Sequence, residues 1–112
     1  MPVRCDEYDQ ICVIAVEGDL SAENAAGFRK LATERIDRQN IIDFVIDMGK
    51  TTFIDSEGLE TLLWLKRRCD DLFGQIKIVA LDDNCRKIVE ITRLEHCFDA
   101  QPDLPAALKM MR

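Results

Sequence analysis

The sequence lacks the residue spacings that build metal and catalytic sites. It has one histidine, His96, and no two cysteines with the Cys-x-x-Cys spacing. Zinc sites draw several Cys or His ligands at short spacings, so we expect no metal, and the sequence indicates no other cofactor. No nucleophile–base pair can be assembled from the remaining residues, and we expect a protein that is not an enzyme.

Long hydrophobic segments are also missing. The longest aliphatic run, residues 11–16, spans six positions, whereas a membrane helix needs about 20. Residues 1–7 lack the apolar core of a secretory signal. We therefore expect a cytoplasmic protein without membrane insertion.

The composition is that of one globular domain, which we expect to span residues 1–112. Hydrophobic residues make up 47% of the chain and charged residues 32%, with a net charge of −6. An acidic surface without a basic stripe repels phosphate backbones, so we expect no direct nucleic-acid binding.

The chain contains five cysteines. The five cysteines form an odd number and no secretory signal accompanies them, which favours reduced thiols. We expect Cys12, Cys69 and Cys85 to fill apolar positions as small hydrophobic residues. His96 is expected at the surface or in packing.

Hydrophobic periodicity predicts strands alternating with helices. Serine or aspartate suits the start of each helix: Ser21, Ser56, Asp82 or Asp83, and Asp103. Gly74 suits the end of the second helix. The predicted strands are residues 3–8, 11–16, 41–48, 76–81 and 98–100.

This order predicts an α/β domain with parallel strand pairing. In the strand at 41–48, one face carries Ile42, Phe44, Ile46 and Met48. The opposite face carries Ile41, Asp43, Val45 and Asp47. Charge on the second face indicates a sheet with only one face fully covered.

Ser56 is the residue that points most clearly to a function. It follows a strand and a short loop, so we interpret it as a helix N-cap with an exposed hydroxyl, where amides and the helix dipole favour an anion. Gly58 lies two positions into this helix although glycine is a poor helix former. Close approach by a partner would explain it.

The stretch Phe53-Ile-Asp-Ser-Glu-Gly-Leu59 resembles the signature of STAS domains, the sulfate-transporter and anti-sigma-factor-antagonist family, and most of all its stand-alone bacterial members. The resemblance continues in Val16-Glu-Gly-Asp-Leu20, in Gly74 before Ile76-Lys-Ile-Val79, and from Ile88 to Phe98. It implies the STAS fold: a mixed, mainly parallel sheet of four to five strands with about four helices packed mainly on one face.

The resemblance also implies a role in partner switching. Ser56 would be phosphorylated by an anti-sigma factor that is also a serine kinase, and phosphorylation would release that partner. A phosphatase would be a further partner, and the chain itself a monomer or weak homodimer. The implied partner-binding residues are Asp19, Leu20, Ser21, Asp55, Ser56, Glu57, Gly58 and Leu59.

Three positions depart from the family pattern. Glu57 replaces a common Ser or Thr, Ser21 a common Asp, and Arg93 a common Gly. A helix N-terminus stabilises an exposed anion by about 0.3–1 kcal/mol. Two unit charges about 4 Å apart repel by roughly 4 kcal/mol at a surface-like dielectric constant, before screening. Repulsion from Asp55, Glu57 and Glu60 therefore outweighs the dipole, and a phosphate would act by changing the surface.

Several interpretations stay open. Ser56 is either a phosphoacceptor or only a cap, and Asp55 either orients its hydroxyl or bonds loop amides. Leu63 and Trp64 belong either to a contact patch or to the core. The alternative function is a non-phosphorylated STAS subunit of a membrane lipid-transport ABC complex. A receiver domain using Asp47 is disfavoured because the acidic pair and lysine of that chemistry are missing.

Overall fold

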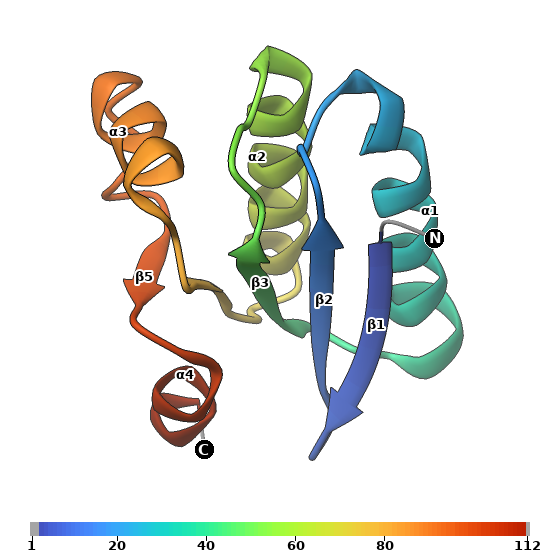
Figure 1. Ribbon diagram of the computed structural model, residues 1–112. Coiled ribbons are helices and arrows are strands. Elements are labelled where there is room, and N and C mark those ends of the chain that lie inside the picture. The colour runs from blue at the N-terminus through green and yellow to red at the C-terminus, as the bar shows by residue number, and fades with distance from the viewer. Residues whose placement is uncertain (1–2, 112) are drawn as a thin grey trace.

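A computed structural model describes residues 3–111, which form an α/β domain with the predicted alternation of strands and helices (Figure 1). The sheet order is β1-β2-β3-β4-β5, with β1 antiparallel to β2 and every other pair parallel. The strands are β1 (Val3–Tyr8), β2 (Ile11–Glu17), β3 (Asp43–Lys50), β4 (Ile76–Val79) and β5 (Asp99–Gln101). The helices are α1 (Ala22–Gln39), α2 (Ser56–Asp71), α3 (Asp83–Ile91) and α4 (Leu104–Met110).

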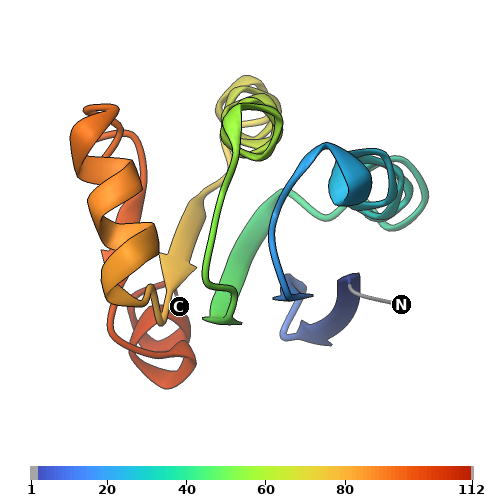
Figure 2. The ribbon, with the colours of Figure 1, turned by 45° about the horizontal axis from the view of Figure 1, so that its top comes forward.

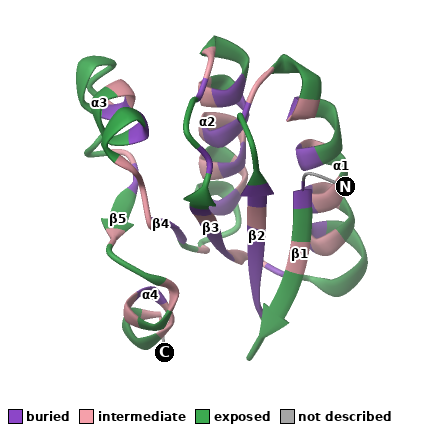
Figure 3. Cartoon of the chain, in the orientation of Figure 1, coloured by how far each residue is buried: buried purple, intermediate pink, exposed green. Residues whose placement is uncertain are grey.

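The helices divide unequally between the two faces of the sheet. Helices α1, α2 and α3 supply the larger core on one face, and α4 packs on the other, as Figure 2 shows. The small second core joins Ala107 of α4 to Val13, Val45 and Val79. In Figure 3 the central strands β2 and β3 are largely purple, the colour of buried residues, whereas β1 is mostly exposed. This arrangement confirms the predicted mixed, mainly parallel sheet with helices mainly on one face.

Strand β3 begins two residues later than predicted, at Asp43. The chain leaves α1 through Asn40, whose φ of 56° is left-handed, and the Ile41 amide then donates to the Arg35 carbonyl. Ile41 is therefore buried in the larger core beside the end of α1, and the expectation that it shares the face of Asp43 was wrong. The fifth strand is likewise displaced, by one residue, from 98–100 to Asp99–Gln101.

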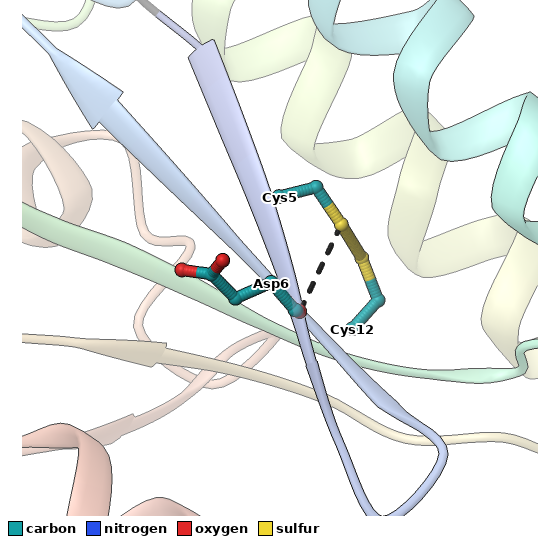
Figure 4. The surroundings of a disulfide bond; sticks show 3 residues. All are labelled: Cys5, Asp6 and Cys12. Carbon is teal, nitrogen blue, oxygen red and sulfur yellow. Dashed lines mark hydrogen bonds between the residues drawn. A yellow bond between two sulfur atoms is a disulfide. The ribbon is translucent and has the colours of Figure 1, made fainter.

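The N-terminal hairpin of β1 and β2 turns at Asp9 and Gln10 and contains an unexpected covalent link. Asp9 and Gln10 both have positive φ, at 50° and 70°, as in the tight turns that match strand twist. Cys5 and Cys12 form a disulfide bond between β1 and β2, with Cα atoms 6.5 Å apart (Figure 4). The prediction of five reduced thiols was therefore wrong, because the hairpin places these two residues on neighbouring diagonal positions of one face.

The predicted burial is confirmed for the three cysteines assigned to apolar positions, Cys12, Cys69 and Cys85. Cys69 and Cys85 are fully buried, and burial raises the pKa of each thiol to about 12. Such thiols stay protonated and unreactive at neutral pH. Across residues 3–111, no helix is both long and apolar enough to cross a membrane.

The parallel connections bring three helix N-termini to one edge of the sheet. Strands β2, β3 and β4 end there, and α1, α2 and α3 begin after short loops. The loop at residues 18–21 and the loop at residues 51–55 meet at this edge. The candidate site is built from their meeting point.

Candidate functional site

Ser56 is the first residue of α2, and its side chain lies in an exposed position. The N-cap of α2 is Asp55 and not Ser56, which corrects the prediction from the sequence. The carboxylate wins this position because its Oδ1 accepts the Gly58 amide at 2.8 Å. The Ser56 hydroxyl is thereby free of the capping role that would have tied it to the backbone.

Asp55 caps a second helix with its other oxygen. Asp55 Oδ2 accepts the amide of Ala22, the first residue of α1, at 3.1 Å. Asp55 therefore bonds backbone amides, as in one of its two expected roles, but these amides belong to helix N-termini and not to a loop. One carboxylate satisfies unpaired amides at two helix N-termini.

Ser21 occupies the N-cap position of α1, as predicted, but its side chain makes no capping hydrogen bond. Its carbonyl accepts the amides of Asn24 and Ala25, at 3.0 Å each. The amide of Ala22 is instead capped by Asp55, which lies 33 residues further along the chain. The start of α1 thus depends on the start of α2.

Backbone hydrogen bonds hold the two loops together. The Leu20 amide donates to the Phe53 carbonyl at 3.0 Å, and the Asp55 amide donates to the Leu20 carbonyl at 3.2 Å. Leu20 and Ile54 form an isolated parallel bridge. Leu20 was expected at a partner surface, but its side chain is fully buried and supports the surface from below.

Gly58 is also buried, and it packs against the backbone of Leu20 in the same chain and not against a surface open to a partner. A Cβ atom at position 58 would overlap the carbonyl oxygen of Leu20. The expectation that glycine leaves room for a partner is therefore corrected. Glycine leaves room for the loop that precedes α1.

Side chains that the sequence did not single out position Asp19. The Asn24 side-chain amide donates to the Asp19 carbonyl at 2.6 Å, and the Thr52 hydroxyl reaches Asp19 Oδ1 at 3.5 Å. The buried Thr51 hydroxyl donates to the Val16 carbonyl at 2.9 Å. The available signal was two threonines in a loop and an asparagine in the first turn of a helix, because both residue types commonly bond nearby backbone.

The outward surface contains the remaining predicted residues. Asp19 and Glu57 are exposed, and Ser21, Asp55 and Leu59 are half-buried. Glu57 lies in the first turn of α2, where the helix dipole favours a negative charge. The structure therefore brings together the backbone positions of all the predicted site residues, although two of their side chains point inward or are absent.

Further along α2, Leu63 and Trp64 are half-buried and pack against the larger core. The Arg29 guanidinium of α1 lies 5.6 Å from the Trp64 ring centroid, a cation–π distance. Trp64 therefore belongs to the contact between α1 and α2 and not to a free surface patch. Within the described residues, no group of three or more His, Cys, Asp or Glu could hold a metal ion.

Comparison with known proteins agrees with the fold described above. The model of the STAS domain family matches residues 3–107. Similar solved structures include a Thermotoga maritima protein described as an anti-sigma factor antagonist, with TM-score 0.92, 15% identity, and coverage of 98% of this chain and 94% of that one.

Two further structures carry related descriptions. An anti-sigma factor antagonist from Mycobacterium paratuberculosis has TM-score 0.85 and 23% identity, with 98% and 92% of the two chains covered. The Bacillus cell fate determinant SpoIIAA, in its phosphorylated form, has TM-score 0.78 and 16% identity, with 98% and 99% covered. At these identities the structures share the fold.

Proposed function

The chain belongs to the STAS domain family, and we propose that it is an anti-sigma factor antagonist regulated by phosphorylation of Ser56. The observation that carries the proposal is the exposed Ser56 side chain, placed at the tip of α2 by a neighbouring aspartate that does the capping. A kinase can reach such a hydroxyl without unfolding the helix. The descriptions of the Thermotoga, Mycobacterium and Bacillus proteins support the same function.

The proposed partner is an anti-sigma factor that is also a serine kinase, with a phosphatase reversing the modification. The chain contributes a binding surface and a phosphoacceptor, and the partner contributes the catalysis. The proposed contacts are the outward parts of Asp19, Ser21, Asp55, Ser56, Glu57 and Leu59, on the backbone frame set by Leu20 and Gly58. We propose that this module spans residues 1–112 and acts in the cytoplasm as a monomer or weak homodimer, without contacting nucleic acid.

Phosphorylation would release the partner by changing the surface. A phosphate adds about −1.5 to −2 charges near neutral pH. At Ser56 it would lie beside the carboxylates of Asp55 and Glu57, in a place where the partner meets a small neutral hydroxyl. A bulky anion there removes both the shape and the charge match.

The experiment is a pull-down from the source organism with wild type, Ser56→Ala and Ser56→Asp. The proposal predicts one kinase-like protein retained by wild type and by Ser56→Ala, and lost with Ser56→Asp. Asn84→Asp is the matched control, because it adds one negative charge at the exposed start of α3, and it should retain the partner.

The alternative, a subunit of a lipid-transport complex, predicts a transporter ATPase retained equally by all four proteins. Retention of the same kinase-like protein by Ser56→Asp would contradict the proposed switch.

A further inference from the structure

We infer that a phosphate on Ser56 also loosens the first turn of α1, acting through the Asp55 carboxylate; this inference rests on the proposed function. The Asp55 side chain bonds backbone amides of both α1 and α2. The phosphate would therefore affect two segments of the partner surface, the start of α2 and residues 19–22.

The two capping hydrogen bonds that Asp55 accepts differ in strength. The bond from the Gly58 amide to Asp55 Oδ1 is 2.8 Å long, partly buried and local to α2. The bond from the Ala22 amide to Asp55 Oδ2 is 3.1 Å long, exposed, and joins two separate elements. A perturbation of the carboxylate breaks the longer, exposed bond first.

The N-cap residue of α1 does not replace Asp55 as a capping group. Ser21 occupies the N-cap position, and its side chain makes no capping hydrogen bond. When Asp55 moves away, the Ala22 amide loses the only capping side chain that the structure gives it within residues 3–111. An uncapped first turn frays more readily.

A phosphate on Ser56 repels the Asp55 carboxylate electrostatically. Ser56 directly follows Asp55 in the chain, so a phosphoryl group on its hydroxyl adds about −1.5 to −2 charges next to the residue that carries the capping carboxylate. Like charges repel each other, and the bond that Asp55 Oδ2 makes to Ala22 is the exposed one. The carboxylate keeps its bond to Gly58 and turns away from Ala22.

Asp19 and Ser21 belong to the proposed contact surface, so fraying at Ala22 removes partner contacts that Ser56 itself does not touch. Three backbone bonds still anchor this loop: Gly18 to Lys50, Leu20 to Phe53, and Asp55 to Leu20. The expected change is therefore confined to the first turn of α1, with the fold intact.

The test is amide hydrogen exchange, followed by NMR, on protein with phosphoserine introduced at position 56 during translation. No kinase is needed, so the result stands apart from whether a cellular kinase uses this site. We expect the Ala22 amide to exchange about 2- to 30-fold faster than in the unmodified protein, the ratio that corresponds to losing one helix cap. The Cys85 amide, capped by Asp82 at 2.8 Å, is the internal reference and should not change.

Asp55→Asn supplies the matched background. Asparagine also caps well, so the Gly58 bond and the fold should be retained, while its side-chain NH₂ cannot accept from Ala22. The Ala22 amide should then exchange faster without any phosphate, and phosphoserine should add nothing further.

Three results would overturn the inference. One is an unchanged Ala22 exchange rate in the phosphorylated wild type. A second is slower exchange, which would mean that the phosphate itself caps α1. The third is an equal effect of the phosphate in wild type and in Asp55→Asn.

Discussion

Gly58 of α2 lies directly against the backbone carbonyl of Leu20, which precedes α1. The same carbonyl accepts the Asp55 amide, so the two helix starts are joined through backbone as well as through the Asp55 side chain. Any side chain at position 58 forces these segments apart. The position of Ser56 beside the start of α1 therefore depends on a buried glycine that no partner needs to contact.

Gly58→Ala should destabilise the fold by about 1–3 kcal/mol, because the added methyl overlaps backbone atoms that cannot rotate away. Urea denaturation measures the effect. Gly27→Ala is the control within α1, where an added Cβ meets no atom within 4 Å. It should stabilise by about 0.5–1 kcal/mol through helix propensity. Equal effects of the two substitutions would contradict the packing described for Gly58.

Asp55→Ala should cost about 2 kcal/mol of unfolding free energy, since it removes caps from two helices at about 1 kcal/mol each. Asp82→Ala removes one cap, from α3, and should cost about 1 kcal/mol. Parallel urea titrations give the comparison. If Asp55→Ala costs no more than Asp82→Ala, the bond to Ala22 contributes nothing to stability.

The Cys5–Cys12 disulfide should stabilise the hairpin end of the sheet. It closes a loop with a sequence separation of 7, for which loop-closure entropy gives about 2–3 kcal/mol. Reduction with a dithiol, or Cys5→Ser, should lower the unfolding free energy by that amount, while Cys97→Ser changes little. Intact mass before and after reduction counts the bonded thiols. Five free thiols in the unreduced protein would refute the disulfide.

The Lys77–Asp99 pair should make stability depend on pH in the acid range. Lys77 is nearly buried on β4, and its hydrogen bond lowers the pKa of the Asp99 carboxyl below the usual 3.8. A lowered pKa means that the stabilisation is complete above this usual value and is lost as the pH falls towards the lowered one.

Asp99→Asn should therefore cost about 1 kcal/mol at pH 7, a value reduced by the half-exposed position of Asp99. The cost should shrink at acid pH, where the wild-type carboxyl takes up its proton. Urea midpoints of both proteins between pH 2 and 7 provide the test. A constant difference across that range would contradict the assigned pairing.

The element order could be predicted because each strand and helix has its own hydrophobic period. Phe44, Ile46 and Met48 alternate along β3, and Ala25, Phe28, Ala32 and Ile36 follow one side of α1. The start of β3 was misplaced because Ile41 is held by the end of α1, a backbone effect that apolar alternation does not reveal.

The position of the candidate site could be predicted from the sequence, but the hydrogen bonds that hold it together could not. The sequence indicates a serine at a helix start after a strand, and Ser56 lies there in an exposed position. The capping of Ala22 by Asp55 depends on two loops meeting at the sheet edge, and nothing local to either residue signals it. The disulfide was missed for a related reason, because counting cysteines ignores which of them a hairpin brings together.

The most direct test of the account is to incubate the purified partner recovered on the wild-type chain with this protein and ATP, and to locate the phosphate by mass spectrometry. Ser21 and Ser56 are the two serines in the sequence, so the assignment is simple. We expect one phosphate, on Ser56, none on Ser56→Ala, and loss of partner binding by the phosphorylated form. A phosphate on any other residue, or unaltered binding after modification of Ser56, would contradict it.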